Sequence, residues 1–500
     1  MDFILSEKLK NHFTDMVVYK DLKHTNFFST LSLPSFMRDW LLHKFQDGDT
    51  GELDKERLID FVHRNLPKRE EWTSIKNRLI IEREHVKFLA RISADIDIKT
   101  SNISFALPDY GLSPSDSIID ESVWAECAQY LTSGRDTWGI VTLGYRDAEN
   151  YDARFSSSGK MKSAKGGKIK LLNFKHFCPY HIDIDFYKDA RKEFTTEEWI
   201  DVLLAAIDYN PDGYGDENQK ITMLTRILPF LEKRLNLIEL APKGTGKSYL
   251  YGRVSRFGWL SSGGTMTRAK MFYDQNKGKD GIIANNDFVV LDEIQTISFG
   301  DTDEMRAALK GYLESGEYTI GNHKNKSDAG FILCGNISKE IMDQNGYVDM
   351  FQELPKELYE SALVERFHGF IKGWDIPRMN DDLKIDGWAL NSEYFCSILH
   401  ELRNDMSYRT IVDELTEVPA GADTRDTEAI KRIATAYLKL IFPHVRTPGD
   451  LDPIEFNRYC LQRAKNMRDL IRVQLANMDA EYKGKDIPNV TVKPIYKTPF

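Results

Sequence analysis

The stretch LIELAPKGTGKS, residues 237–248, decides the fold of this chain. An apolar run leads into a glycine-rich turn, and Lys247 and Ser248 follow before an apolar and aromatic segment. This order predicts a strand, a loop and the start of a helix. The backbone N–H groups of such a loop surround phosphate groups, and the helix N-terminus adds a partial positive charge. The stretch therefore predicts a binding site for ATP.

The loop meets the pattern G-x-x-x-x-G-K-[ST] at every fixed position except the first, where Ala241 replaces glycine. An alanine can occupy this corner if its φ is negative. In this pattern the lysine reaches the β- and γ-phosphates, and the hydroxyl of Ser248 is a ligand of Mg²⁺. The residues predicted to bind the nucleotide are Lys243, Gly244, Thr245, Gly246, Lys247 and Ser248.

A second apolar run, FVVLDE at 288–293, ends in two acidic residues. In P-loop ATPases the first acid orders the water shell of Mg²⁺, and the second polarises the attacking water. We therefore predict that Asp292 belongs to the metal site and that Glu293 is catalytic. The alternative is a buried strand with two surface acids, but the position behind a phosphate loop argues against it.

Residues 305–317 have helical spacing, and two β-type runs follow, YTIG at 318–321 and AGFILCGN at 329–336. We expect two strands around the tip NHKNKSD. Asn336 ends the second strand, where a polar side chain can hold the attacking water or the γ-phosphate. Asn336 is therefore a predicted catalytic residue.

Two basic segments are candidates for DNA contact. The first, residues 151–168, lies between the β-type runs 138–145 and 168–174, as in a small β-barrel with a flexible hairpin. The second is the tip 322–328, which would line the pore if subunits form a ring. The predicted DNA-contacting residues are Lys160, Lys162, Lys165 and Lys168 in the first and His323, Lys324 and Lys326 in the second. Solvated surface loops are the alternative for both.

Arg366 lies between an acid and an aromatic residue in SALVERFHGFIKGW, residues 361–374. A guanidinium there can stabilise the charge that spreads over a γ-phosphate, as an arginine finger does. A structural arginine within one chain is the alternative. Residues 423–442 have apolar residues at helical spacing and carry Arg425. We interpret this segment as part of a small helical lid over the nucleotide.

Composition and pattern exclude several classes of protein. The 67 basic and 77 acidic residues give a net charge of −10, so the chain is not a bulk polycation and DNA contact must come from local patches. Five irregularly spaced cysteines indicate a reducing compartment. His176, Cys178 and His181 match no established zinc spacing and are interpreted as structural. Since neither a membrane span nor a signal peptide is evident, we expect a cytoplasmic protein without a membrane partner.

The order of these residues resembles a known type of ATPase. Lys247-Ser248, Asp292-Glu293, a hairpin, Asn336, Arg366 and Arg425 follow one another as in the AAA+ core of MCM-type replicative helicases. VERF is similar to the arginine-finger box of those proteins, although His368 replaces the usual acid, and TRDTEAIKRIATAYLKL is similar to their sensor-2 helix.

A closer resemblance, over roughly 135–480, is to BrxL, the Lon-related AAA+ family of BREX bacteriophage-defence systems. It rests on unrelated segments in the right order: WGIVTLGY, FTTEEWIDVLL, NLIEL-PKGTGKS, the SGG of 262–264, FILCGNIS, ERFHGFIKGWDIP and LKLIFP.

This resemblance implies a DNA-binding AAA+ ATPase that uses ATP and Mg²⁺ and forms a homo-oligomeric ring, a hexamer with single or stacked rings left open, beside other phage-defence proteins. By the MCM analogy, the phosphate loop, Asp292, Glu293 and Asn336 act on the chain's own nucleotide, and Arg366 and Arg425 reach the neighbour's. Long members carry a Lon-like protease domain with a Ser–Lys dyad. Because about twenty residues follow the last helical stretch here, we expect a short form without protease activity.

The expected fold class is α/β: an AAA+ P-loop ATPase core with a helical lid, preceded by a helical N-terminal region and a small β-rich, OB-like DNA-binding domain. Helical spacing at 36–45 and 75–92 and at 194–207 and 221–235 supports this division. The expected domains are 1–130, mostly helical; 131–190, β-rich; 191–235, helical linker and start of the AAA+ module; 236–378, ATPase core; 379–482, helical lid; and 483–500, tail.

Three functions remain open from the sequence. The first is an ATPase that clamps on or translocates along DNA. The second is a protein-remodelling ATPase that works with a separate protease, although pore loops for polypeptide usually present an aromatic residue. The third is a nucleotide-gated DNA-binding scaffold with little turnover.

Overall fold

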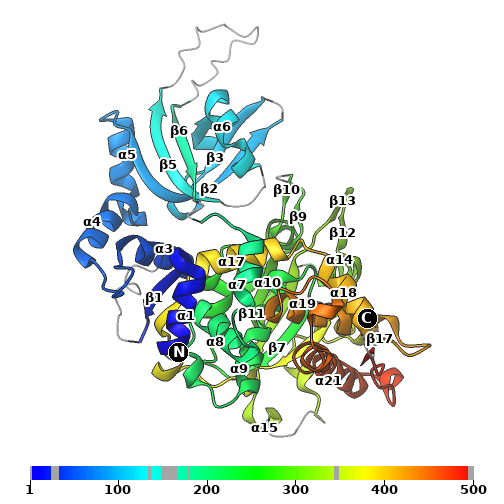
Figure 1. Cartoon of the computed structure of the whole chain (residues 1–500). Coiled ribbons are helices and arrows are strands. Elements are labelled where there is room, and N and C mark those ends of the chain that lie inside the picture. The colour runs from blue at the N-terminus through cyan, green and yellow to red at the C-terminus, as the bar shows by residue number, and fades with distance from the viewer. Residues whose placement is uncertain are drawn as a thin grey trace. The chain divides into compact units, whose positions relative to one another are not determined.

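A computed structural model describes residues 3–23, 33–98, 100–132, 137–147, 166–177, 180–276, 278–300, 302–342 and 348–493. The chain forms two compact units (Figure 1). Unit 1 combines Met1–Gly51 with Ile182–Phe500, and unit 2 is Glu52–His181. Unit 2 is therefore an insertion in the sequence of unit 1.

In the part that the structure describes, unit 2 is a closed barrel of five strands. Its elements are α4 (Lys55–Asn65), α5 (Trp72–Ile80), β2 (Val86–Asp97), β3 (Asn102–Ala106), β4 (Ser117–Ile119), α6 (Glu121–Leu131), β5 (Thr137–Arg146) and β6 (Lys168–His176). The order around the barrel is β2-β3-β4-β6-β5, and β2 pairs with β5 to close it. β4 and β6 are parallel, whereas the other neighbours are antiparallel. Phe88, Val141 and Leu171 are among the buried residues that fill the interior.

Strand β2 corrects the expectation of a mostly helical region over 1–130. Helical spacing predicted one helix over 75–92, whereas α5 ends at Ile80 and a strand begins at Val86. Residues at every second position from Val86 to Ile92 are buried, which points them into the barrel. The barrel therefore begins well before the expected boundary, because a period of two, and not 3.6, governs this segment.

Unit 1 is built around a five-stranded sheet in the order β15-β7-β14-β11-β8. The strands are β7 (Leu237–Ala241), β8 (Gly258–Met266), β11 (Phe288–Phe299), β14 (Gly330–Asn336) and β15 (Gly369–Lys372). All neighbours pair in parallel. β7 and β14 are buried almost throughout, as in parallel sheets covered on both faces. Parallel pairing places the loops that follow these strands at one edge of the sheet, where ligands bind in such folds.

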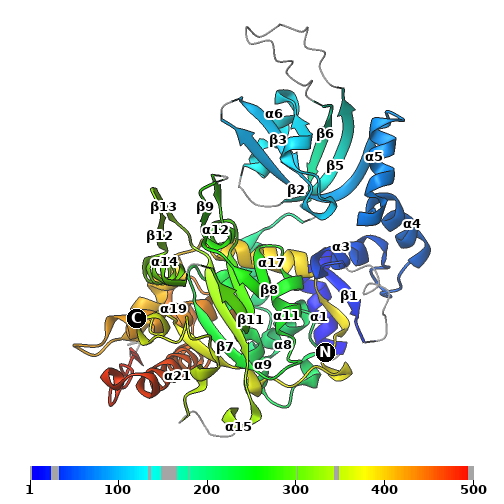
Figure 2. The same cartoon turned by 180° about the vertical axis from the view of Figure 1, so that it is seen from behind.

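The described part of unit 1 also contains helices, several of which lie beside this sheet (Figure 2). They are α1 (Phe3–Phe13), α3 (Ser35–Phe45), α7 (Ile184–Arg191), α8 (Thr196–Ala206), α9 (Glu217–Thr225), α10 (Leu228–Leu231), α11 (Lys247–Tyr249), α12 (Arg268–Met271), α13 (Ile282–Asn285), α14 (Thr302–Ser315), α15 (Lys339–Met342), α16 (Ser361–Val364), α17 (Ser392–Leu402), α18 (Ser407–Leu415), α19 (Thr424–Ile441), α20 (Pro453–Phe456) and α21 (Gln462–Met478). Thr195 and Glu198 form a capping box at the start of α8. The helix predicted over 221–235 is instead divided into α9 and α10, because Pro229 has no N–H to continue α9.

The C-terminal part of unit 1 is helical, in the region that the sequence assigned to a lid. Asp423 caps α19 by accepting a hydrogen bond from the N–H of Asp426. Within the expected tail, β18 (Thr491–Val492) pairs with β17 (Thr416–Glu417), so the described part of the tail is attached to unit 1. No helix in the described ranges is both long and apolar enough to cross a membrane.

The N-terminal segment belongs to unit 1 and not to a separate domain. β1 (Val17–Asp21) pairs antiparallel with β16 (Asp386–Leu390). The buried Lys20 of β1 forms ion pairs with Asp208 at 3.0 Å and with Asp39 at 3.1 Å. Arg38 of α3 pairs with the same two carboxylates. Because buried charges are tolerated only when they are paired and hydrogen-bonded, this cluster fixes the segment to unit 1.

We expect Lys20→Met to lower the free energy of unfolding by about 3–5 kcal/mol, because it leaves two buried carboxylates with one cation fewer. The measurement is chemical denaturation followed by circular dichroism. Lys23→Met is the matched control, since Lys23 pairs with Asp382 at the surface at 3.6 Å. It should cost less than about 1 kcal/mol. Equal effects of the two substitutions would contradict the structural role of Lys20.

Candidate functional site

The phosphate loop joins β7 to α11. β7 ends at Ala241, whose strand conformation meets the requirement for a negative φ. Gly244 and Gly246 have φ of +83° and +80°, a left-handed conformation that favours glycine. The buried side chain of Lys247 folds back over the loop, and its Nζ lies 3.4 Å from the carbonyl oxygen of Ala241. The ammonium group therefore stands inside the loop, where it can meet a phosphate.

Ser248 and Asp292 meet at the carboxyl edge of the sheet. The Ser248 hydroxyl donates a hydrogen bond of 2.6 Å to Oδ2 of Asp292, which is buried. The other carboxylate oxygen accepts a hydrogen bond of 2.9 Å from the N–H of Glu293. A hydroxyl and a carboxylate oxygen are the hard ligands that Mg²⁺ prefers, so these residues fit a magnesium site held by Ser248 and, through its water shell, by Asp292.

Glu293 has an exposed side chain and a φ of +52°. Such a backbone is strained in a residue other than glycine, and strain of this kind occurs at functional sites. The register between β8 and β11 shifts directly after Asp292. Gly263 of β8 lies beside this irregularity with a φ of +62°, and a Cβ at this position would lie 3.2 Å from Oγ1 of Thr296. The irregular strand therefore presents the Glu293 carboxylate to solvent at the edge that carries the phosphate loop.

Asn336 is the last residue of β14, directly beside Ala241 of β7 in the sheet register. Its backbone is held by the side-chain amide of Gln295. The Gln295 amide nitrogen donates to the Asn336 carbonyl at 2.7 Å, and the Asn336 N–H donates to the Gln295 oxygen at 3.2 Å. Asn336 therefore lies at the same edge of the sheet as Asp292 and Glu293, and Gln295 is a positioning residue that the sequence analysis did not identify.

A buried ion pair lies beneath the phosphate loop. Arg226 and Glu239 are both fully buried, and the guanidinium Nε is 3.1 Å from each oxygen of the carboxylate. Nη1 of Arg226 also donates to the backbone carbonyl of Thr245 at 2.6 Å, and Nη2 to its hydroxyl at 3.1 Å. Burial alone lowers the pKa of Arg226, but the Glu239 charge outweighs it and raises the pKa above the usual value. Arg226 is therefore a charged brace for the loop.

The sequence holds a signal for this brace. Glu239 is the one charged residue in the apolar strand LIELA, and a charge in a central strand of a parallel sheet requires a buried partner. Its spacing to Arg226 gives no hint of contact, because the two residues belong to different elements.

Residues outside the loop pattern also hold its far side. The Tyr249 hydroxyl donates to Asp208 at 2.7 Å, and the Tyr209 hydroxyl donates to the carbonyl of Gly246 at 3.4 Å. The N–H of Met379 donates to the carbonyl of Gly244 at 2.7 Å. Asp208 is the acceptor that Lys20 and Arg38 also share, so the N-terminal segment contributes to the position of the first helical turn after Ser248.

The two arginines predicted to be catalytic converge on one carboxylate. Oε2 of Glu314 lies 2.9 Å from Nε of Arg366 and 3.1 Å from Nη2 of Arg425. Arg425 also pairs with Glu365. The structure therefore brings these arginines together, but with acidic residues and not with the phosphate loop.

The arginine cluster lies at the opposite edge of the sheet from the phosphate loop. Gly369, the first residue of β15, pairs with Leu237, the first residue of β7, and Arg366 precedes β15. The phosphate loop begins after the far end of β7, about 13 Å away along the strand at about 3.3 Å per residue. Within one chain, the arginines are therefore separated from the phosphate loop by the length of β7.

His368, which stands where an acid is usual, has a structural place. Nδ1 of its half-buried side chain accepts a hydrogen bond of 3.0 Å from the N–H of Asn236, just before β7. Burial, together with Arg432 and Arg468, lowers the pKa of His368 well below its usual value. A neutral histidine is therefore built into the start of the central strand.

The predicted basic hairpin is formed differently from the expectation. β12 (Glu317–Ile320) pairs with β13 (His323–Lys326), and β14 is not part of this hairpin. His323, Lys324 and Lys326 therefore lie in a strand and not in a long tip. The expected pairing with 329–336 is wrong because that segment is apolar and buried, and it pairs with β7 and β11 in the central sheet.

A second hairpin, which the sequence analysis missed, stands beside the first (Figures 1 and 2). β9 (Tyr273–Asp274) pairs with β10 (Lys279–Asp280). The Tyr273 ring stacks on His323 with centroids 3.6 Å apart, and Asn325 donates to Asp280 at 3.0 Å. Lys324 pairs with Glu317 on its own hairpin at 3.1 Å. These cross-contacts make the two hairpins one surface with cations, acids and an aromatic ring.

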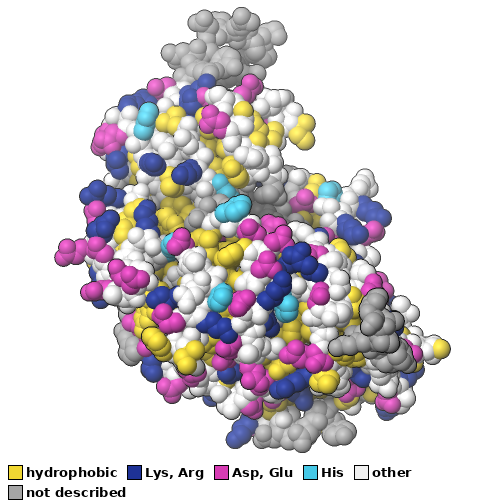
Figure 3. All heavy atoms as spheres, viewed as in Figure 1, with side chains coloured by type: hydrophobic (Ala, Val, Ile, Leu, Met, Phe, Trp, Pro, Cys, Tyr) yellow, Lys and Arg dark blue, Asp and Glu magenta, His cyan; other side chains and the backbone are white. Residues whose placement is uncertain are grey.

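In unit 2, Lys168 is the first residue of β6, whereas Lys160, Lys162 and Lys165 lie outside the described residues. His176 stacks on Tyr130 with ring centroids 4.7 Å apart, and Cys178 lies outside the described residues. The described ranges contain no group of three or more His, Cys, Asp or Glu residues that could hold a metal ion. On the face shown in Figure 3, basic and acidic side chains are intermixed, so charge is local and not spread as one broad patch.

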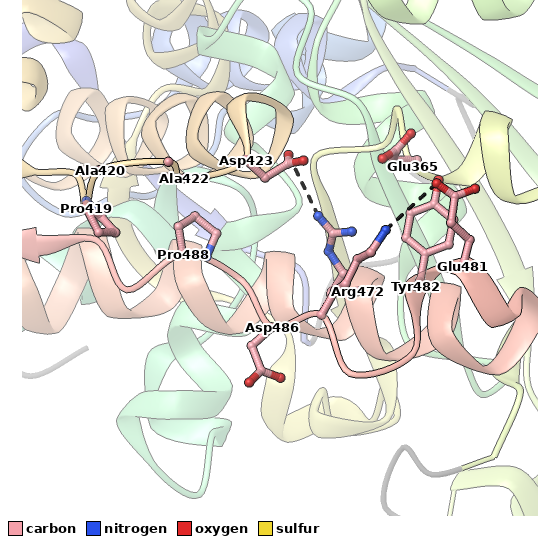
Figure 4. Close-up of a pocket in the computed structure, with 12 residues that line it drawn as sticks. Glu365, Pro419, Ala420, Ala422, Asp423, Arg472, Glu481, Tyr482, Asp486 and Pro488 are labelled. Atoms are coloured by element: carbon pink, nitrogen blue, oxygen red, sulfur yellow. Dashed lines mark ion pairs between the residues drawn. The ribbon is translucent and has the colours of Figure 1, made fainter.

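A cavity of about 460 Å³ borders the arginine cluster (Figure 4). Glu365, the partner of Arg425, is part of its lining. Acids and cations both line the cavity, and they occur in pairs, such as Arg472 with Asp423 at 3.8 Å and Lys485 with Glu481 at 3.9 Å. The cavity therefore favours neither an anionic nor a cationic ligand.

Two family models match the chain. The model described as "Lon-like protease BrxL-like, ATPase domain" matches residues 169–487, and the model described as "BREX system Lon protease-like protein BrxL N-terminal" matches residues 11–145. The "Lon-like protease BrxL" of Escherichia coli O9:H4 (strain HS) is 27% identical over 478 residues, which are 95% of this chain and 65% of that protein. The "Lon-like protease BrxL" of Bacillus cereus (strain H3081.97) is 25% identical over 472 residues, 94% of this chain and 67% of that protein. The chain thus spans about two thirds of these relatives.

Arg226→Lys tests the brace beneath the phosphate loop. A single ammonium cannot contact Glu239 and the Thr245 carbonyl together as the planar guanidinium does. We expect the affinity for ATP, measured by calorimetric titration, to fall about tenfold, which corresponds to about 1.4 kcal/mol. Arg458→Lys is the control, since Arg458 is exposed and pairs with Glu217 at 2.9 Å on the surface of α9. Unchanged affinity in a folded Arg226→Lys protein would refute the role.

Proposed function

This chain belongs to the BrxL family of BREX systems, and from that premise we propose that it is an oligomeric AAA+ ATPase that binds DNA. It couples the binding and hydrolysis of ATP to clamping on or translocating along DNA in bacteriophage defence. The observation that carries the proposal is the Ser248–Asp292 hydrogen bond of 2.6 Å at the mouth of the phosphate loop, with Glu293 next to it.

Each residue at this edge has a chemical task. The loop N–H groups and Lys247 bind the phosphates, and Ser248 and Asp292 hold Mg²⁺, which when bound neutralises charge on the phosphate oxygens. Glu293 orients the attacking water and accepts its proton. Asn336, whose backbone Gln295 holds, is close enough to Ala241 in the sheet to address the γ-phosphate or the water.

A ring completes the site. Arg366 and Arg425 lie at the far edge of their own sheet, so we assign them to the nucleotide of a neighbouring copy, where a guanidinium stabilises charge on the γ-phosphate. In a head-to-tail ring every copy offers one phosphate loop and one pair of arginines. We propose a hexamer, with the choice between single and stacked rings left open.

Two features support DNA as the partner. The barrel order β2-β3-β4-β6-β5 is that of a five-stranded Greek-key barrel, and OB-folds of this kind bind nucleic acid through the loops after their first and fourth strands. The basic segment with Lys160, Lys162 and Lys165 is the connection after the fourth strand, β5. The paired hairpins provide a second surface with cations, among them Lys324 and Lys326, beside acidic residues, and a ring would turn this surface toward its pore.

A protein-remodelling ATPase is the second candidate, and Tyr273 is the observation that favours it. Pore loops for polypeptide usually present an aromatic ring, and Tyr273 lies at the paired hairpins. Stimulation of ATP turnover by unfolded protein and not by DNA would select this candidate. Tight, salt-sensitive DNA binding with very slow turnover would select a nucleotide-gated scaffold instead.

Lys247→Ala should abolish ATP binding, and Glu293→Gln should keep binding but lower kcat by at least about 10²-fold, because only the water-activating carboxylate is lost. ATP titration and phosphate release measure the two effects. Lys243→Ala is the matched control: its side chain is exposed, and its contribution is through the backbone. A wild-type protein without turnover, with Glu293→Gln no different, would end the proposal.

Arg366→Ala should leave ATP binding intact and lower kcat by about 10³-fold or more, as loss of an arginine finger does. Mixing it with Lys247→Ala should restore part of the turnover, because a mixed ring contains interfaces with one intact loop and one intact arginine. Arg409→Ala, which removes an arginine that pairs with Glu428 of α19 at 2.7 Å, is the control. Full turnover of Arg366→Ala, or of a strictly monomeric protein, would exclude the shared site.

A further inference from the structure

We propose that Glu314 is a positioning residue that keeps Arg366 and Arg425 paired within their own chain until DNA binds. Through Glu314, the two arginines are coupled to the hairpin of β12 and β13. The inference rests on the proposed function, in which both arginines act on a neighbour's nucleotide. Neither the phosphate-loop pattern nor the acidic pair Asp292-Glu293 predicts a role for Glu314.

Glu314 is placed to neutralise both arginines at once. One oxygen, Oε2, is 2.9 Å from Nε of Arg366 and 3.1 Å from Nη2 of Arg425. Glu365 accepts a hydrogen bond from the other terminal nitrogen of Arg425, Nη1. A γ-phosphate from a neighbouring copy must therefore compete with two carboxylates for these guanidinium groups, and the acids set the cost of engaging it.

Glu314 also stands next to the hairpin. It lies in the last turn of α14, and Ser315 and Gly316 alone separate it from β12. The joint is held from several sides: the N–H of Gly316 donates to the Tyr312 carbonyl at 2.7 Å, and the N–H of Ser327 donates to the Gly316 carbonyl at 2.9 Å.

The connection between α14 and β12 is tightly packed at Gly316. A Cβ at Gly316 would lie 2.7 Å from the Ser327 carbonyl oxygen and from Cδ of Arg234. The Tyr312 hydroxyl further donates to the Ala329 carbonyl at 2.5 Å, just beyond the hairpin. A force on β12 and β13 is therefore passed to the end of α14 and to Glu314. DNA that displaces the hairpin would move the carboxylate away from the arginines and free them for the neighbour's phosphate.

The test compares Glu314→Gln with the wild type in the full chain, by ATP turnover with and without a duplex oligonucleotide at fixed salt. Loss of the negative charge removes the ion pair of Arg366 without DNA and leaves Arg425 paired with Glu365 alone. We expect kcat without DNA to rise about two- to fivefold, the size of effect that a partly exposed ion pair allows. KM for ATP should stay unchanged, and the factor by which DNA stimulates turnover should fall toward one. Glu314→Asp keeps the charge and should remain closer to the wild type.

Glu360→Gln is the matched control. Glu360 precedes α16 and pairs with Lys310 at 2.5 Å and with Arg306 at 3.8 Å, both in α14, the helix that carries Glu314. Among the described residues, its ion pairs do not include Arg366 or Arg425. It should change neither basal turnover nor the DNA effect. If Arg366→Ala is inactive and kcat of Glu314→Gln without DNA is unchanged or lower, the proposed reserve role is wrong while the shared site stands. If Arg366→Ala keeps full turnover, the proposed function fails and this inference falls with it.

Discussion

The buried ion pair between Arg226 and Glu239 is the constraint on which the nucleotide site depends. Both side chains are fully buried, and removing two charges from water is costly unless every polar atom finds a partner. Arg226 meets this demand by binding Glu239 and the Thr245 carbonyl together. The chain therefore cannot place Glu239 in its central strand without also fixing the loop that follows it. A loop that must surround a triphosphate gains its shape before the ligand arrives.

The direction of the sheet gives the second constraint. In a parallel sheet all strands end at one edge, and here that edge holds the phosphate loop, Asp292, Glu293 and Asn336. The arginines precede their strand or begin a helix, so they lie at the other edge, and no local rearrangement brings them to their own loop. In the proposed ring, the two half-sites at opposite edges of the sheet would meet between neighbouring copies. The same geometry makes Glu314 and Glu365 the partners of the arginines within a single chain.

The features that could be predicted from the sequence are those whose structure is determined by residues close together in the chain. The phosphate loop, strand β11 and the capping box of α8 each follow from a short pattern whose physics lies within it. Residues 86–92 of β2 fall within the helix that spacing predicts over 75–92, because an apolar run with Leu89 between buried alternate residues satisfies both periods. The partner of β13 and the contacts of Glu314 were not accessible, since they are decided by which distant segments pack together.

The division of the chain into units also bears on the nucleotide site. Unit 2 is inserted between the N-terminal segment and the rest of unit 1, and that segment supplies Lys20 and Arg38 to Asp208. Asp208 in turn accepts the hydrogen bond of Tyr249, which follows Ser248 of the proposed magnesium site in the sequence. The segment that precedes the inserted unit therefore shares a charge cluster with Tyr249, in the first helical turn after the phosphate loop. Because a buried network of two cations and two carboxylates has few alternative arrangements, it holds that turn in one position.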